Sequence, residues 1–435
     1  MAKGDRVDAS RLAAYDVLRA VRLDDAYANL ALPHVLTEHK LAGRDAAFTT
    51  ELVSGTIRWQ GTYDAIIDAC LTKPRLEAKV RDALRLGVHQ LLAMRVPDHA
   101  AISTSVDLVR ARVGVGPTGL TNAVLRKVSA DDLDTWIERV APDRALDPVG
   151  FASIAHSHPR WVVEALGEAL GTAAELSALL SADNAAPKVM LVARPGLSSV
   201  DELIAAGGVR GTLSPYAVEL AGGDPSAVPA VAQGRAGVQD EGSQLVALAL
   251  VEAALDGRDE RWLDVCSGPG GKAALLAALA ARQGARVLAN ESQHHRAKLV
   301  VRGTRAAASG LSGVVTGDGT RPPWREGTFD RTLVDAPCSG LGALRRRPES
   351  RWRRTPQDLD VLVPLQRDLL ASAISSTRPG GVIVYATCSP VLAETTGVVT
   401  AVLAGRDDAH LEGTRQLWPH RDGTDAMFIA TIRRH

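Results

Sequence analysis

Two cysteines in the second half of the chain lie in short turns of similar composition. Cys338 belongs to the stretch D-A-P-C-S-G (335–340), and Cys388 belongs to Y-A-T-C-S-P (385–390). A lone cysteine is more often a small core residue than a reactive one. Two thiols in matched turns, one of them close to the carboxylate of Asp335, favour a chemical role instead.

A glycine-rich turn stands earlier, in D-V-C-S-G-P-G-G-K (264–272), directly after a short apolar run. Glycines let the backbone approach a ligand closely. The turn has neither the G-x-G-x-x-G spacing of dinucleotide sites nor the G-x-x-x-x-G-K-[ST] spacing of triphosphate sites. A nucleoside without phosphates fits better, and S-adenosylmethionine is the obvious candidate; the alternative is a plain strand-to-helix turn. The candidate cofactor-binding residues here are Cys266, Ser267, Gly268, Pro269, Gly270, Gly271 and Lys272.

Two acidic residues support a nucleoside ligand because each follows a predicted strand. Glu291 comes after the apolar run at 286–289, and a carboxylate at that place accepts hydrogen bonds from ribose hydroxyls. Asp318 comes after the run at 314–316 and would accept from an adenine amino group. Either acid alone would more often be a solvated surface residue. Together, at successive strand ends, they favour a nucleoside site.

A cluster of arginines follows the first cysteine turn in R-R-R-P-E-S-R-W-R-R (345–354). Guanidinium groups suit phosphate, and an aromatic ring beside them stacks on an unpaired base. The alternative is a solvated helix face. Because the cluster lies next to the cysteine turn, we expect RNA contact. The candidate RNA-binding residues are Arg345, Arg346, Arg347, Arg351 and Trp352, with Arg353 and Arg354 adjoining them.

Thiols, a carboxylate and arginines together suit the methylation of cytosine at C5. This carbon is a poor nucleophile until a thiolate adds to C6 and drives electron density onto C5. The adduct must then lose its C5 proton and expel the thiol. An ordinary thiol, with a pKa of about 8.5, is only slightly ionised at neutral pH, so the site must favour the thiolate. Cys388 and Cys338 supply thiols, and Asp335 supplies a group that faces the ring at N3.

These motifs give the chain a clear family resemblance. The C-terminal half resembles the RsmB/Sun family of RNA cytosine-C5 methyltransferases through D-V-C-S-G-P-G-G-K (264–272), F-D-R-T-L-V-D-A-P-C-S-G (329–340), R-R-R-P-E-S-R-W (345–352) and Y-A-T-C-S-P (385–390). The first 145 residues resemble the NusB-type RNA-binding bundle of these proteins, and H-P-R-W (158–161) resembles their connector. The resemblance therefore covers nearly the whole chain.

The resemblance implies a role for each site residue. Cys388 would be the nucleophile, Cys338 would assist breakdown of the adduct, and Asp335 would bind the target base. S-adenosylmethionine would lie on the turn 266–272 with Glu291, Asp318 and Asp335. The implied partner is small-subunit ribosomal RNA, as free RNA or an early assembly intermediate, in which one cytosine is modified.

The sequence also departs from the family pattern. Gly268 and Ala273 stand where the family usually has Ala and Thr, and Glu291 replaces the more usual Asp. Thr332 interrupts a normally aliphatic strand, and Glu394 is followed by threonine rather than the frequent asparagine. No departure removes a reacting group, so they bear on substrate choice more than on reaction type.

Composition limits the class of protein to which the chain can belong. The chain has 435 residues, zero formal net charge and four cysteines. It therefore has no global basic field, and a nucleic-acid partner must meet a local patch. Few, unevenly spaced cysteines argue against a disulfide scaffold. The start M-A-K-G-D-R-V-D-A-S has no signal-peptide core, and the longest apolar run (245–255) is too short to span a bilayer. We expect a cytoplasmic monomer without a metal site or membrane association.

Three parts are predicted to position these residues. Residues 1–145 have helical periodicity throughout, with Ser10 as the expected first N-cap, and predict an all-α bundle. Residues 146–232 predict a small α/β connector with a strand at 188–193. Residues 233–435 alternate strands with helices, which predicts a parallel, doubly wound, Rossmann-like class I methyltransferase sheet. Its strands are expected at 262–265, 286–289, 314–316, 332–335 and 382–386.

Two other functions remain open from the sequence. A methyltransferase acting on a small molecule or a protein keeps the cofactor turn but leaves the second thiol and the arginines unexplained. Its substrate binding would be insensitive to salt, unlike phosphate contacts. A non-catalytic RNA-binding assembly factor would bind RNA through the N-terminal bundle, and loss of either thiol would change nothing.

Overall fold

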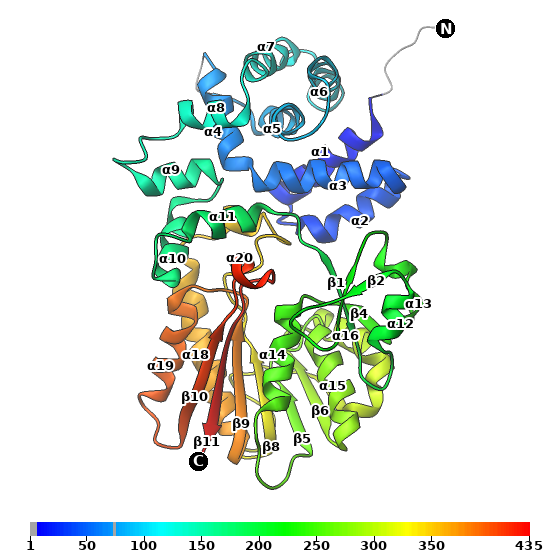
Figure 1. The fold of residues 1–435 in the computed structure, drawn as a ribbon, viewed down its shortest axis with the longest axis vertical. Coiled ribbons are helices and arrows are strands. Elements are labelled where there is room, and N and C mark those ends of the chain that lie inside the picture. Colours follow the sequence, from blue (N-terminus) through cyan, green and yellow to red (C-terminus); the bar gives the residue numbers. More distant parts are fainter. Residues whose placement is uncertain (1–6, 73–74) are drawn as a thin grey trace. The chain divides into compact units, whose positions relative to one another are not determined.

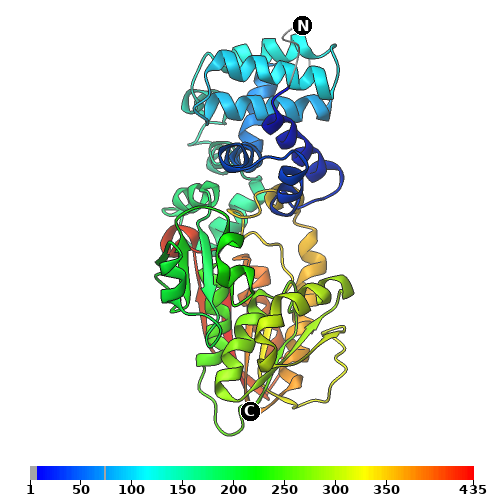
Figure 2. The ribbon, with the colours of Figure 1, turned by 90° about the vertical axis from the view of Figure 1, so that its right-hand side faces the viewer.

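The computed structural model describes residues 7–72 and 75–435, and the chain forms two compact units. The helical unit contains Met1–Ala185 and Leu344–Arg353, and the sheet unit contains Ala186–Ala343 and Arg354–His435. Figure 1 labels most of their elements, and Figure 2 shows the two units from a second direction. The predicted connector, 146–232, is thus divided between the two units. The first six residues, part of the stretch in which no signal peptide was predicted, lie outside the described residues.

The helical unit confirms the all-α prediction. Its first helix begins at Asp8 rather than at Ser10: the Asp8 carboxylate accepts from the Arg11 N–H at 2.9 Å, while Ser10 is buried inside the helix. Apolar side chains of the helices form two buried clusters, one around Leu52 and one around Ile66. The helices are α1 (Ala9–Leu23), α2 (Ala28–Glu38), α3 (Gly43–Arg58), α4 (Gln60–Cys70), α5 (Ala78–Leu92), α6 (Asp98–Arg112), α7 (Thr118–Val128), α8 (Leu133–Val140), α9 (Pro148–Ala155), α10 (Arg160–Leu170), α11 (Leu176–Asn184) and the short α17 (Ser350–Arg353).

The sheet unit begins with a small antiparallel sheet in the order β2-β3-β1-β4. The predicted strand at 188–193 is β1, one of its two interior strands. Leu191 and Val218 pair across the sheet and are fully buried. The elements are β1 (Val189–Ala193), α12 (Val200–Ala205), β2 (Gly208–Arg210), β3 (Ala217–Leu220), α13 (Pro229–Ala232) and β4 (Ala236–Val238).

A seven-stranded sheet follows, in the order β10-β11-β9-β8-β5-β6-β7. The five predicted strands are all present as β5 to β9, and they are parallel. The sheet is not wholly parallel, because β11 runs antiparallel to both β9 and β10. The strands are β5 (Arg261–Asp264), β6 (Arg286–Glu291), β7 (Leu311–Thr316), β8 (Phe329–Asp335), β9 (Thr377–Thr387), β10 (Ala409–Gln416) and β11 (Phe428–Arg434).

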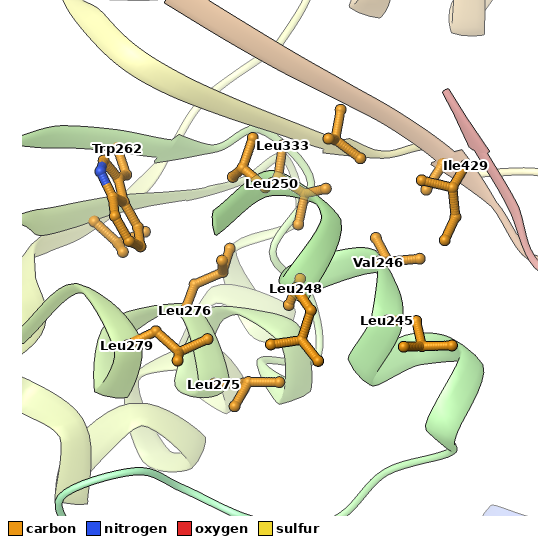
Figure 3. Packing of buried hydrophobic residues seen from close by; sticks show 14 of the residues in the cluster. Leu245, Val246, Leu248, Leu250, Trp262, Leu275, Leu276, Leu279, Leu333 and Ile429 are labelled. Atoms are coloured by element: carbon orange, nitrogen blue, oxygen red, sulfur yellow. The ribbon is translucent and has the colours of Figure 1, made fainter. Parts of the chain in front are cut away.

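Helices cover both faces of this sheet, so successive strand residues are buried on opposite sides. Leu333 packs with α14 and α15 on one face (Figure 3), and Val334 packs with α18 and α19 on the other. The indole of Trp262, fully buried, belongs to the first cluster. The helices are α14 (Glu241–Glu252), α15 (Gly271–Gln283), α16 (His294–Thr304), α18 (Asp358–Ser376), α19 (Thr396–Leu403) and α20 (Pro419–Asp422).

The order of the strands determines where a ligand would lie. The chain moves from β5 outward through β6 to β7, then returns to place β8 on the other side of β5. A crevice forms at such a switch point, outside the carboxyl ends of the strands. The loops after β5, β6, β7, β8 and β9 all leave from that edge, and they carry the predicted cofactor and catalytic residues of the sheet unit.

Candidate active site

The predicted cofactor turn connects β5 with α15 at the carboxyl edge of the sheet. The Ser267 N–H donates to the Asn290 carbonyl at 2.8 Å, and the Asn290 amide donates to the Val265 carbonyl at 2.9 Å. The guanidinium of Arg296, on α16, donates to the Gly268 carbonyl at 2.8 Å. The turn is therefore attached to the end of β6 and to the helix that follows it.

Two departures from the family pattern explain each other in this turn. The Gly268 N–H donates to Oε2 of Glu291 at 3.1 Å. A Cβ atom added at Gly268 would stand 2.0 Å from that same oxygen, which is an impossible contact. Since glutamate reaches one methylene further than aspartate, the longer acid here occupies the space that the absent methyl group leaves.

The two predicted nucleoside-binding acids differ in their surroundings. Glu291 is nearly fully buried, and its Oε1 accepts from the Gln293 N–H at 3.0 Å. Asp318 is exposed and accepts from the N–H and hydroxyl of Thr320 within its own turn. Each carboxylate oxygen has a second lone-pair direction. Ribose contact by Glu291 and adenine contact by Asp318 stay predictions.

A lysine–carboxylate pair connects the first turn of α15 with the end of β8. The Lys272 ammonium donates to Oδ2 of Asp335 at 2.8 Å. Burial alone would lower the pKa of Lys272, but the charge and hydrogen bond of Asp335, together with Cys388, raise it above its usual value. Burial, and then the charge of Asp335, raise the pKa of Asp264 to about 7. Lys272 therefore stays a cation beside the thiols.

The structure brings the two predicted thiols into contact. Sγ of Cys338 and Sγ of Cys388 are 3.4 Å apart, at the ends of the neighbouring strands β8 and β9. The hydrogen bond with Cys388, followed by burial, raises the pKa of Cys338 well above the usual thiol value. Both residues are half-buried. Cys338 therefore keeps its proton, in contact with the sulfur of Cys388.

Backbone contacts support the pair. The Gly342 N–H donates to the Cys388 carbonyl at 2.9 Å, and the Ala426 N–H donates to the Gly342 carbonyl at 2.8 Å. A Cβ at Gly342 would lie 2.0 Å from the Ala426 carbonyl oxygen, so only glycine fits there. This contact explains the second glycine of S-G-L-G (339–342).

Sequence reasoning did not single out one buried side chain in this region. Glu394, noted only as a departure from the family pattern, is fully buried and accepts hydrogen bonds from both cysteine turns, through Ser339 and Ser389. The one signal available was its nearness to Cys388 in the sequence.

Comparisons with known proteins identify the family of the chain. The sequence profile of the 16S rRNA methyltransferase RsmB/F family matches residues 253–433, and that of the NusB family matches residues 8–130. A putative methyltransferase of Mycobacterium tuberculosis strain H37Rv is 49% identical over 98% of this chain and 97% of its own length. The ribosomal RNA small subunit methyltransferase B of Pseudomonas syringae pv. tomato is 34% identical over 97% of this chain and 96% of its own length.

This chain belongs to the RsmB/F methyltransferase family.

Solved structures share the fold. The crystal structure of PH0851 aligns with 99% of this chain and 100% of its own at a TM-score of 0.80 and 22% identity. NSun6 from Pyrococcus horikoshii, solved with SFG, aligns with 63% of this chain and 98% of its own at a TM-score of 0.54 and 17% identity. The predicted combination of a NusB-type helical domain with a Rossmann-like methyltransferase sheet is confirmed.

S-adenosylmethionine is the cofactor of this RsmB/F methyltransferase. The residues present fit it: Glu291 ends β6, Asp318 follows β7, and the turn at Gly268 leaves no room for a side chain on the approach to Glu291. Bound there, the cofactor would meet backbone and carboxylates rather than an anion-binding nest, as expected for a ligand without phosphates.

The arginine cluster is largely inside the helical unit, contrary to the prediction that all of it contacts RNA. Arg351 is fully buried and donates to the Ser157 and Asp183 carbonyls at 3.1 and 3.2 Å and to Oδ1 of Asn184 at 2.6 Å. The indole N–H of Trp352 donates to the Ile57 carbonyl at 2.7 Å.

Other members of the cluster vary in exposure. Arg345 is buried, and its carbonyl accepts from the Arg58 guanidinium at 3.2 Å. Arg346 is half-buried, whereas Arg347 is exposed with its guanidinium 5.1 Å from the centre of the Tyr27 ring. RNA contact stays a prediction for Arg346 and Arg347, while Arg345, Arg351 and Trp352 pack within the protein.

Within residues 7–72 and 75–435, no group of His, Cys, Asp or Glu side chains has an arrangement that would hold a metal ion. Over the same residues, no helix combines the length and the apolar character that crossing a membrane requires.

Proposed function

We propose that this chain methylates C5 of a cytosine in small-subunit ribosomal RNA through a covalent bond between Cys388 and C6 of the base. One observation carries the proposal: the Sγ atoms of Cys338 and Cys388 lie 3.4 Å apart at the edge of the sheet where the Lys272–Asp335 pair also lies. Methyl transfer to an already nucleophilic oxygen or nitrogen needs no thiol, so a pair of thiols indicates a carbon that must first be activated.

The reaction begins with Cys388. As a thiolate, hydrogen-bonded by the Cys338 thiol and near the Lys272 cation, it adds to C6 and forms an S–C6 bond. The displaced electron pair moves into the ring toward N3, and the Lys272–Asp335 pair holds the proton that N3 then takes up. When bound, S-adenosylmethionine supplies an electrophilic methyl group, which C5 accepts.

Cys338 acts in the release of the product. Once Cys388 is bonded to C6 it is a neutral and weakly accepting thioether, so neither its hydrogen bond nor its charge any longer raises the pKa of Cys338. Cys338 then ionises, losing its proton to water, and accepts the proton from C5. The C5–H electron pair restores the C5–C6 double bond, N3 returns its proton, and Cys388 departs as a thiolate. The hydrogen bond between the sulfurs re-forms, and one proton has been released for each methyl group transferred.

The names of relatives support an RNA substrate. Several full-length relatives are ribosomal RNA small subunit methyltransferases B, including that of Pseudomonas putida, which is 33% identical. C6 must meet Cys388 at the carboxyl edge of a sheet, which a base inside a stacked helix does not reach. The target cytosine would therefore be unpaired or flipped out of its stack. The NusB-type region (8–130) would bind a neighbouring part of the RNA.

Methyl transfer tests the proposal. Wild type and Cys388→Ser are incubated with labelled S-adenosylmethionine and small-subunit ribosomal RNA that lacks the modification, as free RNA and as an assembly particle. Nucleoside mass spectrometry should find 5-methylcytosine with wild type and none with Cys388→Ser. If neither RNA form accepts a methyl group, the cytosine assignment is wrong and an RNA-binding assembly factor becomes the better account.

A further inference from the structure

A buried carboxylate connects the two cysteine turns. Glu394 has no exposed surface and lies just before α19. From the first turn it accepts the Ser339 N–H at 2.8 Å and the Ser339 hydroxyl at 2.5 Å. From the second turn it accepts the Ser389 hydroxyl at 2.6 Å. The Ser339 hydroxyl also lies 3.0 Å from the Ser389 hydroxyl. These two serines directly follow the two reactive cysteines, and the Glu394 carboxylate connects them.

Glu394 is itself supported from the core of the sheet unit. The amide of Gln366, fully buried on α18, donates to Oε1 of Glu394 at 3.0 Å and to the Pro337 carbonyl at 2.9 Å. The Tyr385 hydroxyl donates to the Glu394 carbonyl at 2.7 Å. A buried carboxylate is retained only where donors compensate its desolvation, and here these donors belong to the loops that carry the thiols.

The two thiols depend on Glu394 unequally. Cys388 directly follows the long strand β9, and the Thr387 hydroxyl donates to the Ser389 carbonyl at 2.9 Å, so its turn has other supports. Cys338 lies in a loop beyond β8. Gln366 and Arg354 donate to the carbonyls of its neighbours Pro337 and Ser339, but Glu394 accepts both the N–H and the hydroxyl of Ser339. Loss of the carboxylate would therefore displace Cys338 more than Cys388.

We infer that Glu394 is a positioning residue that holds the Cys338 thiol against Cys388 for the release of the methylated base. It does not touch the substrate, because it is buried behind both turns. This role rests on the proposed function, in which Cys338 accepts the C5 proton while Cys388 is bonded to C6. Formation of the adduct, by contrast, requires Cys388 alone.

Glu394→Gln is the informative substitution. It preserves size but replaces one acceptor oxygen by a donor, so the contacts to Ser339 and Ser389 are no longer all satisfied. Asp330→Asn is the matched control. Asp330 is a fully buried carboxylate at the opposite end of β8 from Asp335, and it accepts the Glu260 and Arg261 N–H groups at 2.8 and 2.9 Å.

Two measurements are made on each full-length variant, with cofactor affinity and melting temperature recorded beside them. The first is the rate at which diamide, an azo oxidant that is reduced to its hydrazine, closes a disulfide between Cys338 and Cys388 in the absence of RNA. The second is the lifetime of the covalent protein–RNA species in a single turnover. Displacement of a reacting group by about 1 Å costs up to about 100-fold. We expect Glu394→Gln to slow both disulfide closure and adduct release by about 10- to 100-fold.

Asp330→Asn should lower the melting temperature without slowing either step, and both variants should bind the cofactor like wild type. If Glu394→Gln closes the disulfide at the wild-type rate, the inference is wrong whatever the enzyme does with RNA. If disulfide closure slows but wild type and Cys338→Ala form no adduct, the proposed function fails and the positioning role stands. Should Glu394→Gln fail to fold, Ser339→Ala removes one of its contacts and repeats the test.

Discussion

Replacing Cys338 by alanine should convert a transient intermediate into a stable covalent complex. Cys388 would still add to C6 and C5 would still be methylated, because neither step needs the second thiol. The C5 proton would then have no acceptor. Since C5 is bonded to C6, a sulfur 3.4 Å from the attacking sulfur would stand within reach of that proton.

The size of the effect follows from the role of a positioned base. General base catalysis contributes about 10²- to 10⁴-fold to a proton transfer. Each factor of ten corresponds to about 1.36 kcal/mol, so the barrier to release should rise by about 3 to 5 kcal/mol. Cys338 is half-buried, and removal of one sulfur should cost only about 1 kcal/mol of stability. Release, not folding, is therefore the step that fails.

Denaturing gel electrophoresis checks this expectation. Cys338→Ala with RNA and cofactor should give a slowly migrating band that disappears on treatment with ribonuclease, and wild type should give little. Cys70→Ala, which alters a buried thiol of the helical unit, is the control and should behave as wild type. Undiminished multiple turnover by Cys338→Ala without a shifted band would refute the role given to Cys338.

Three further predictions concern the cofactor turn, the buried acid and the arginine cluster. Gly268→Ala should weaken binding of S-adenosylhomocysteine about tenfold, or about 1.4 kcal/mol, because the new Cβ meets Glu291. Adding Glu291→Asp should restore the affinity. Calorimetry that shows no recovery in the double variant would contradict the steric account. Asp264, with a pKa raised to about 7, keeps its proton in the folded state between about pH 4 and 7, whereas the unfolded chain loses it. The free energy of unfolding therefore falls by up to about 4 kcal/mol as pH rises from about 4 to 7. Asp264→Asn should flatten this part of the pH profile in urea unfolding, and an unchanged slope would disprove the assignment. Arg351→Ala should lower the free energy of unfolding by about 3 to 5 kcal/mol. Arg347→Ala should instead reduce the slope of log affinity for RNA against log salt by about one. A reduced salt slope for Arg351→Ala with unchanged stability would identify Arg351 as an RNA contact.

Strands buried on both faces could be predicted because their apolar runs are continuous. The strands β5 to β9 were all expected, with ends that differ by a few residues. The strand β10 was not, since it is an edge strand whose side chains from His410 to Arg415 are exposed and polar or small for the most part. Its partner β11 was missed with it, and the antiparallel pairing of these strands depends on contacts that no local pattern encodes.

In the candidate site too, features set by a local pattern could be predicted and features set by distant contacts could not. Residues at the ends of strands were found because the strand fixes which edge they share, as for Asp335 and Cys388. The burial of Arg351 was missed because its partner Asp183 lies 168 residues earlier, and an arginine that contacts phosphate looks the same in sequence as one that contacts carbonyl groups. Glu394 was missed for a related reason, as its donor Ser339 stands 55 residues away.

Release of tritium from the base tests the central claim most directly. Small-subunit RNA carrying [5-³H]cytosine is incubated with the enzyme and S-adenosylmethionine, and the tritium freed into water is counted against the methyl groups incorporated. The account predicts one tritium released for each methyl group transferred by wild type, and neither with Cys388→Ser. Methyl incorporation without release of tritium would contradict it, because C5 would then not be the atom that is modified.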